Sequence, residues 1–263
     1  MDAADGDDLH IWWLGQSGFL FKQAGAWLLV DPYLSDSLTL KYAATDKPHV
    51  RMTERCIEPD QLRFVPVIAS SHQHTDHFDE ATLMPLANAR SGLDLVLPAA
   101  VETQARSRLS GATVTFHGID SGTSVELHGW HIQGVAAAHN EVERDERGRC
   151  KFLGFVIRRN GFTLYHSGDT LLHPGLANEV PTDCDVMFLP INGNKPERRV
   201  AGNMNGREAA LFASSMRAKL VIPHHFDMFT FNTESPATFV SACQEHHQPH
   251  KVMSCGERLS VAR

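Results

Sequence analysis

The sequence contains few cysteines, and none of them falls in a disulfide or metal-binding pattern. The five residues are odd in number, scattered and without C-x-x-C spacing: Cys56, Cys150, Cys184, Cys243 and Cys255. Such a distribution argues against a disulfide framework and favours a reducing compartment.

Long apolar runs, a basic N-terminal region and an excess of positive charge are also missing. No apolar stretch approaches the length of a membrane span, and residues 1–8 are acidic and polar rather than signal-like. The net charge of −7 at pH 7 provides no electrostatic attraction for nucleic acid or an anionic membrane. These absences predict a cytoplasmic protein without nucleic-acid or membrane partners.

No linker, low-complexity tract or short repeat divides the 263 residues, so we expect one domain over residues 1–263. A hydrophobic content of 42% and a charged content of 21% are ordinary for a soluble globular protein. Apolar runs and turn residues predict strands over 9–14, 18–23, 27–31, 64–69, 93–97, 113–117, 124–127, 131–137, 152–159, 162–166, 185–190, 220–223, 251–254 and 258–261. Helices are predicted over 79–89, 99–109 and 236–247, and from the capping box at 205–208 to about 216. Strands and helices alternate in two halves, which predicts an α/β fold of two packed sheets with helices outside.

The most informative stretch is His72-Gln73-His74-Thr75-Asp76-His77, directly after the apolar run 64–69. Side chains two apart in extended backbone share a face, so His72 and His74 can bind one cation together. Asp76 and His77 follow the turn and can hold a second cation nearby. Imidazole and carboxylate ligands without thiolate suit a catalytic centre with open positions. The alternative is a histidine-rich surface loop, which the order and spacing of these residues disfavour.

Potential ligands recur at other predicted strand ends. His139 follows the strand expected to end at 137, Asp169 follows that over 162–166, and His225 follows that over 220–223. A single histidine at a strand end is more often structural than a ligand. Together with the opening cluster, however, these three residues complete two three-ligand sets and a bridge.

These residues resemble the metallo-β-lactamase superfamily of αββα hydrolases, whose signature H-x-H-x-D-H is followed by isolated His, Asp and His. The resemblance runs nearly end to end and implies a four-layer αββα sandwich (α/β, α+β). More narrowly, the chain resembles the UlaG-like branch, named for a bacterial L-ascorbate-6-phosphate lactonase. Three stretches carry this similarity: Trp12-Trp13-Leu14-Gly15, Leu164-Tyr165-His166-Ser167-Gly168-Asp169 and Ala218-Lys219-Leu220-Val221-Ile222-Pro223-His224-His225. That lactonase lacks a clear counterpart of His139, so its own substrate does not carry over.

The resemblance implies a place for each ligand. Metal one falls on His72, His74 and His139. Metal two falls on Asp76, His77 and His225, with Asp169 as the bridge. His225 rather than the adjacent His224 aligns with the last ligand, and Asp31 matches a buried aspartate that orients the site.

The resemblance also implies a mechanism. Two divalent cations roughly 3.5–4 Å apart would share a hydroxide and polarise the substrate oxygen, because a bound metal lowers the pKa of water to about 7. Asp76 and Asp169 are the expected catalytic residues, with Asp76 orienting the hydroxide and shuttling its proton. Zinc suits these ligands best, and manganese or iron would fit the same His/Asp mixture.

The polar segment 192–205, between a predicted strand and the capped helix, is the expected substrate loop. Its candidate contacts are Asn192, Asn194, Lys195, Arg198 and Asn203. A cation there could hold a phosphate or carboxylate of an anionic small-molecule substrate. An ordinary solvated connection is the alternative.

The function favoured by these residues is hydrolysis of a small ester or lactone. A phosphodiesterase acting on a small phosphodiester is the first alternative. An iron-dependent thiol dioxygenase is the alternative from another class, and a non-catalytic scaffold is disfavoured because no ligand is missing. Lactonase-like relatives assemble into homo-oligomers, which the resemblance implies here too.

Overall fold

Two β-sheets face each other in the computed structural model, which describes residues 6–89 and 92–263. The first sheet has the order β13-β1-β2-β3-β4-β5-β6, and the second has the order β12-β11-β10-β9-β8-β7. The strands of the first sheet are β1 (Leu9–Trp13), β2 (Phe19–Gln23), β3 (Ala26–Val30), β4 (Val67–Ala69), β5 (Leu93–Pro98), β6 (Val114–Ile119) and β13 (Arg258–Val261). Those of the second are β7 (Ser124–Leu127), β8 (Trp130–Ala136), β9 (Leu153–Arg159), β10 (Phe162–His166), β11 (Val186–Pro190) and β12 (Val221–His224).

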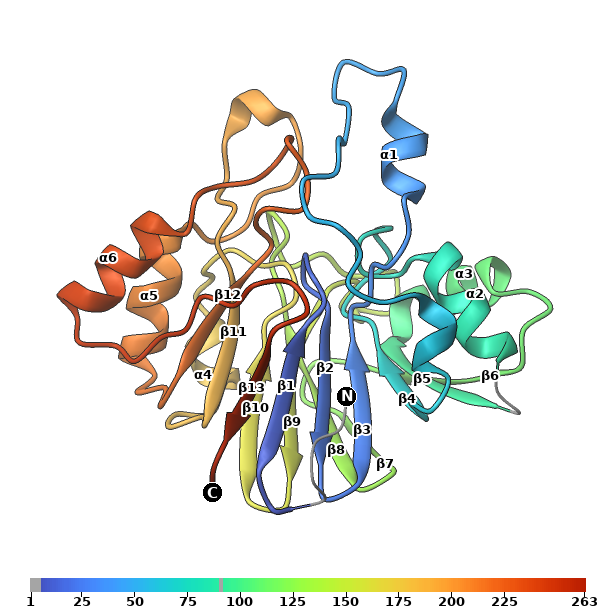
Figure 1. The fold of residues 1–263 in the computed structure, drawn as a ribbon, viewed down its shortest axis with the longest axis horizontal. Helices are drawn as coiled ribbons and strands as arrows, with labels where there is room; N and C mark the ends of the chain where they lie inside the picture. Colours follow the sequence, from blue (N-terminus) through green and yellow to red (C-terminus); the bar gives the residue numbers. More distant parts are fainter. Residues whose placement is uncertain (1–5, 90–91) are drawn as a thin grey trace.

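Helices cover the outer face of each sheet (Figure 1). On the first sheet lie α2 (Glu80–Asn88) and α3 (Glu102–Arg108), and on the second lie α5 (Gly206–Ser215) and α6 (Ala237–Glu245). The shorter helices are α1 (Ser37–Tyr42), η1 (Pro59–Leu62), η2 (Ala99–Val101), α4 (Leu176–Glu179) and η3 (Pro196–Arg198). This is the predicted four-layer αββα sandwich.

Side chains of β1 alternate between the two faces of the first sheet, so this one strand contributes to two hydrophobic clusters. Leu9, Ile11 and Trp13 join the core between the sheets, whereas Trp12 packs on the outer side with the residues under α2 and α3. Because successive side chains of a strand point to opposite faces, an unbroken apolar run such as β1 is buried on both sides.

The predicted elements are largely confirmed, with one wrong strand. Residues 251–254 form no strand: the backbone N–H of Lys251 donates to Val221 at 3.0 Å, and the chain then turns away. Ser254 closes that turn, since its N–H donates to the Glu257 carboxylate at 2.8 Å. The helices α1 and α4 were not predicted, and residues 64–66 precede β4 rather than belong to it.

Parallel pairing decides where the loops meet. Strands β3, β4, β5 and β6 run parallel, as do β10, β11 and β12. Their carboxyl ends lie at the upper edge of Figure 1, where α1 and the loop containing η3 stand above the sheets.

All five cysteines are free thiols. Among the helices in the described ranges, none has the length and apolar character needed to cross a membrane.

Substitution of Gly206, the first residue of α5, tests how closely α5 and α6 pack. A Cβ added at Gly206 would lie 2.7 Å from the backbone nitrogen of Phe239 on α6. We expect Gly206→Ala to lower the free energy of unfolding by about 1–3 kcal/mol through overpacking, although alanine is the better helix former. Urea denaturation measures this loss, and Ser215→Ala on the exposed end of the same helix is the control. Equal stability of the two variants would contradict the close approach.

Candidate metal centre

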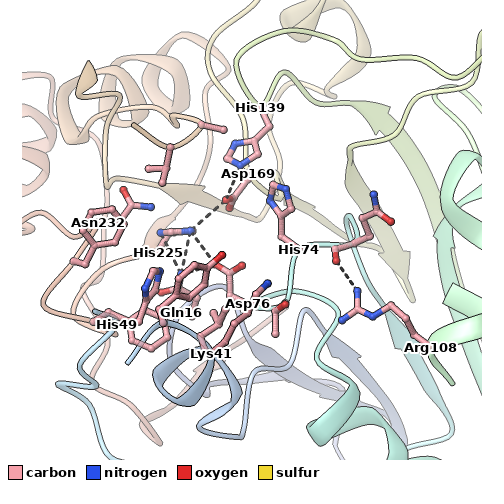
Figure 2. A pocket seen from close by; sticks show the side chains of 18 residues that line it. Gln16, Lys41, His49, His74, Asp76, Arg108, His139, Asp169, His225 and Asn232 are labelled. Carbon is pink, nitrogen blue, oxygen red and sulfur yellow. Dashed lines mark hydrogen bonds and ion pairs between the residues drawn. The ribbon is translucent and has the colours of Figure 1, made fainter. Parts of the chain in front are cut away.

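Every predicted ligand lies in a loop that follows a strand at the same edge of the sheets. The residues 72–77 follow β4, His139 follows β8, Asp169 follows β10 and His225 follows β12. Figure 2 shows His74, Asp76, His139, Asp169 and His225 converging on one space. Asp169 is central: its carboxylate oxygens lie 3.2 Å from Nε2 of His77, 3.2 Å from Nε2 of His225 and 3.9 Å from Nε2 of His139. The structure therefore brings all seven side chains together.

The seven side chains form three overlapping groups, each able to hold a metal ion. One group is His72, His74 and His139, the second is Asp76, His77 and His225, and the third is His72, His77 and Asp169. Within each group the ligand atoms lie within 4.8 Å of one another. The first two groups coincide with the predicted ligand sets, and the third joins them through Asp169.

Buried atoms without partners show that a cation fits this cluster. Nε2 of His72, Nε2 of His77 and Oδ1 of Asp169 are buried and have no hydrogen bond within the described part of the chain. Leaving a buried polar group unsatisfied costs about 1–3 kcal/mol, more when it is charged. The three atoms belong to the residues of the third group above, so cations bound at the cluster would satisfy all three.

The buried Asp31 fixes the orientation of the candidate ligand His77. Oδ2 of Asp31 lies 2.7 Å from Nδ1 of His77 and accepts the Ser71 hydroxyl at 2.6 Å, and Oδ1 accepts the Ser71 backbone N–H at 2.7 Å. Fixing Nδ1 of His77 in this way leaves its Nε2 directed at the cluster. The orienting role expected of Asp31 is therefore visible in its contacts.

Three residues of the site adopt a left-handed backbone conformation. Gln16, Asp31 and His225 have φ values of 50°, 45° and 59°. Such values are uncommon for residues other than glycine and persist where surrounding contacts hold them, often at functional sites. Asp31 and His225 directly follow β3 and β12, and Gln16 lies in the turn after β1. At each position the bend in the backbone directs the side chain into the cluster.

Burial and neighbouring charge set the protonation of the cluster. Burial alone would raise the pKa of Asp169, but His225 and His77 outweigh it and hold that pKa well below its usual value. Burial would lower the pKa of His225, yet Asp169 and Asp76 raise it to about 9. Burial lowers the pKa of His72 well below its usual value, aided by His77 and His74. Cations bound here would displace the protons of His77 and His225.

Of the two adjacent histidines, His225 joins the cluster and His224 lies behind it. The ring of His224 stacks on His166, with centroids 4.9 Å apart, and its Nδ1 lies 3.0 Å from the Ser17 hydroxyl. His166 accepts the Gly168 N–H at Nδ1, so its Nε2–H donates to the carbonyl of Ser17 at 2.9 Å. These buried rings support the turn that carries Asp169.

Val200 and Ala201 of the expected substrate loop line the cavity beside the cluster, but none of its five candidate contacts does. Asn203 donates to the side chain of Asn192 at 3.0 Å, and both residues are buried. Lys195 and Arg198 pair with Glu234. Asn194 and Lys195 line a separate cavity of about 200 Å³. A role of these residues in substrate binding stays a prediction.

A cavity of about 710 Å³ opens directly onto the cluster. His74, Asp76, His139, Asp169 and His225 line it, and so do the cationic residues Lys41 and Arg108, which the sequence did not single out. Its size falls within the roughly 300–1,000 Å³ of small-molecule sites.

Gln16 contacts two of the candidate ligands and was also missed by sequence reasoning. Its Nε2 donates to Oδ2 of Asp76 at 2.9 Å and lies 3.0 Å from Nε2 of His225, and the residue is 3% exposed. Its carbonyl accepts the indole N–H of Trp13 and the backbone N–H of His225, both at 3.0 Å. The one available signal was its place in the turn after a predicted strand, beside Trp12-Trp13-Leu14-Gly15.

Shortening Gln16 tests whether this amide orders the second ligand group. Gln16→Asn keeps the amide and tolerates a left-handed backbone, but it withdraws the donor from Asp76 by one methylene. We expect zinc affinity to fall about 10- to 100-fold, as for other partners of metal ligands. Titration against a chelating indicator measures the affinity, and Gln133→Asn on β8, far from the cluster, is the control. Unchanged zinc affinity in Gln16→Asn would refute the role.

Known proteins share both the sequence pattern and the fold. The beta-lactamase superfamily domain matches residues 26–226. A protein of Opitutus terrae, named UPF0173 metal-dependent hydrolase, is 27% identical over 258 residues, covering 96% of this chain and 100% of its own. Another of that name, from Anoxybacillus flavithermus, is 30% identical over 183 residues, covering 67% of this chain and 75% of its own.

A solved structure supports the same fold. That of an isothiocyanate hydrolase from Delia radicum gut bacteria superposes with a TM-score of 0.74 at 18% identity, covering 96% of this chain and 99% of that one. At this identity the likeness establishes the fold alone. The family match over most of the chain and the relatives agree: this chain belongs to the beta-lactamase superfamily domain family and, within it, to the UPF0173 metal-dependent hydrolases.

Proposed function

We propose that this protein is a metal-dependent hydrolase that cleaves a small ester or lactone at a dinuclear His/Asp centre. The observation that carries the proposal is the convergence of seven imidazole and carboxylate side chains, three of them with buried atoms that lack a hydrogen bond in the described residues, at the base of one cavity. The names of the relatives, metal-dependent hydrolases, support the reaction class. The finer likeness to UlaG-like lactonases rests on the three sequence stretches given above.

In this proposal His72, His74 and His139 hold one ion, and Asp76, His77 and His225 hold the other. Asp169 lies between the two sets. Divalent ions held there would supply a hydroxide nucleophile at neutral pH and polarise the substrate carbonyl. Zinc is the preferred ion for imidazole and carboxylate ligands, with manganese or iron as alternatives.

Asp76 is the proposed proton carrier. Its carboxylate faces the cavity, and Oδ2 is held by the Gln16 amide and lies 3.4 Å from Nε2 of His225. His77 and His225 outweigh the effect of burial and hold its pKa well below the usual value, so the carboxylate is ionised at neutral pH. In that state it can accept the proton of the attacking water and deliver it to the leaving alkoxide.

The remaining expectations are part of the same proposal. A cytoplasmic location and a partner limited to small molecules fit the composition, and a homo-oligomeric state follows from the resemblance to the lactonases. The net charge of −7 disfavours nucleic acid as a substrate.

A substrate panel separates the two hydrolase hypotheses. Purified protein loaded with zinc or manganese is assayed on aliphatic and aryl esters, five- and six-membered lactones, and a generic phosphodiester, bis-(4-nitrophenyl) phosphate. We expect ester or lactone hydrolysis that a chelator abolishes and added metal restores. Preferential cleavage of the phosphodiester would replace the proposal with a phosphodiesterase. Iron content with thiol-dependent oxygen uptake would replace it with an oxygenase.

Removing the central carboxylate tests the two-ion arrangement. We expect Asp169→Ala to lower the bound metal from about two ions to one or fewer and to reduce kcat at least about 1,000-fold, because both ligand sets lose the group between them. Metal analysis and circular dichroism on the same sample distinguish loss of metal from loss of fold. Glu245→Ala, which removes the carboxylate of an exposed surface ion pair with Arg207, is the control. Full activity in Asp169→Ala would overturn the assignment.

A further inference from the structure

The side of the cavity away from the strand ends is aromatic, and this feature bears on the substrate if the proposed function holds. Four side chains make up this aromatic wall: Tyr42, His49, Phe229 and Phe231. Tyr42 comes from α1, His49 from the segment after it, and the two phenylalanines from the loop after β12. None of the four is a candidate metal ligand.

His49 is the centre of the aromatic wall. Its ring stacks on Tyr42, with centroids 4.4 Å apart and an interplanar angle of 26°, and it meets Phe229 and Phe231 at 5.2 and 5.1 Å. Burial lowers the pKa of His49, which makes the ring neutral at pH 7. Aromatic pairs favour offset or edge-on contacts with centroids about 4.5–7 Å apart, so a flat ligand ring can extend this cluster.

Backbone and side-chain hydrogen bonds hold the aromatic wall in place before any ligand arrives. The hydroxyl of Thr39 donates to the His49 carbonyl at 2.7 Å, and Nδ1 of His49 donates to the Lys47 carbonyl at 2.8 Å. The segment is joined to the loop after β12 by Met52 N–H to Met228 O at 2.8 Å and by Thr230 N–H to Val50 O at 2.9 Å. A surface ordered in this way binds with little further loss of entropy.

A cation without a carboxylate partner lies at the rim of the aromatic wall. Nζ of Lys41 is 5.1 Å from the centroid of Tyr42, and no acidic side chain within residues 6–89 or 92–263 forms an ion pair with it. By contrast, Lys195 and Arg198 pair with Glu234, and Arg199 pairs with Asp46. Lys41 is exposed, and Figure 2 shows it on the same side of the cavity as His49.

The second cation of the cavity lies elsewhere. Arg108 donates to the backbone carbonyls of Gln73 and Phe78 and stacks on the Phe78 ring, so much of its donor capacity is used. In Figure 2 it lies beyond His74, away from His49. Lys41 is therefore the cation that a group bound on the aromatic wall would meet.

We propose that the substrate carries an aryl group that stacks on the aromatic wall, with an anionic substituent on that ring bound by Lys41 at the rim. Its ester or lactone carbonyl then lies at the His/Asp cluster, which lines the same cavity. The substrate class is thus an aryl acid whose ring is separated from the cleaved ester by a short linker. A chain with a net charge of −7 has no general attraction for anions, so the local cation makes this orientation specific.

Methyl esters that share one leaving group isolate the contribution of the ring. The test compares methyl 3-phenylpropanoate, methyl 3-cyclohexylpropanoate and methyl 3-(4-carboxyphenyl)propanoate on the metal-loaded protein. Because phenyl and cyclohexyl groups are similarly apolar, their difference reports stacking. We expect kcat/KM to be about 3- to 10-fold higher for phenyl than for cyclohexyl. The carboxyphenyl ester should gain about a further fivefold at low salt and lose that gain at high ionic strength.

Conservative variants show which side chains cause the preference for phenyl and the gain from the carboxylate. Tyr42→Leu and Phe231→Leu, both at partly exposed positions, should abolish the preference for phenyl, whereas Phe64→Leu should retain it. Phe64 is a matched control, since it is a partly exposed aromatic that packs on Trp27 away from the cavity. Lys41→Met should abolish only the gain from the carboxylate, and Lys219→Met at a surface ion pair should not. Unchanged preferences in the variants of the aromatic wall and of Lys41 would overturn the proposal.

Binding without turnover separates this inference from the proposed function. Calorimetric titration of the metal-loaded protein with 3-phenylpropanohydroxamate and 3-cyclohexylpropanohydroxamate reports the aromatic wall directly. Tighter binding of the phenyl compound, lost in Tyr42→Leu, supports the aryl subsite even if no ester is hydrolysed. Equal binding of the two compounds to the wild-type protein overturns it even if esters are cleaved.

Discussion

Histidine and aspartate side chains are buried at the edge where two sheets end, with fewer hydrogen bonds than they can make. Nε2 of His72, Nε2 of His77 and Oδ1 of Asp169 belong to one group of potential ligands, and each lacks a hydrogen bond within residues 6–89 and 92–263. Such an arrangement is costly in the absence of a cation. The fold tolerates it because the surrounding strands are almost wholly buried and leave the loops little freedom to relax.

Asp31 shows how the rigid part of the fold reaches the site. It directly follows β3, accepts hydrogen bonds from the backbone and hydroxyl of Ser71 after β4, and contacts His77 at the other end of the same loop. One carboxylate thereby fixes the start and the end of the 71–77 loop. The positive φ of Asp31 is part of this geometry, because it turns the side chain from the strand direction toward the neighbouring loop.

The sequence was sufficient for the layers and for the opening cluster of candidate ligands, since both depend on local patterns, whereas His139, Asp169 and His225 were identified through the family resemblance. Alternating and continuous apolar runs identify strands, and the spacing in His72-Gln73-His74-Thr75-Asp76-His77 is specific enough to stand alone. The residue pairs that the sequence did not reveal are long-range. Gln16 has no chemical signature until the fold places it against Asp76 and His225, and the pairing of Lys195 with Glu234 depends on a distant segment. The strand predicted over 251–254 was wrong because its apolar pattern is satisfied at the edge of β12 by a short contact followed by a turn.

Two separate parts of the chain build the two sides of the cavity. The cluster side consists of short loops tied to strand ends, whereas Tyr42, His49, Phe229 and Phe231 belong to segments that stand outside the sheets and are joined mainly to each other. Mutations in those outlying segments can therefore alter which compounds are accepted while the ion-binding geometry is preserved. Divergence of specificity among related proteins should accordingly concentrate between β3 and β4 and after β12, which makes these two stretches the natural targets for redesign.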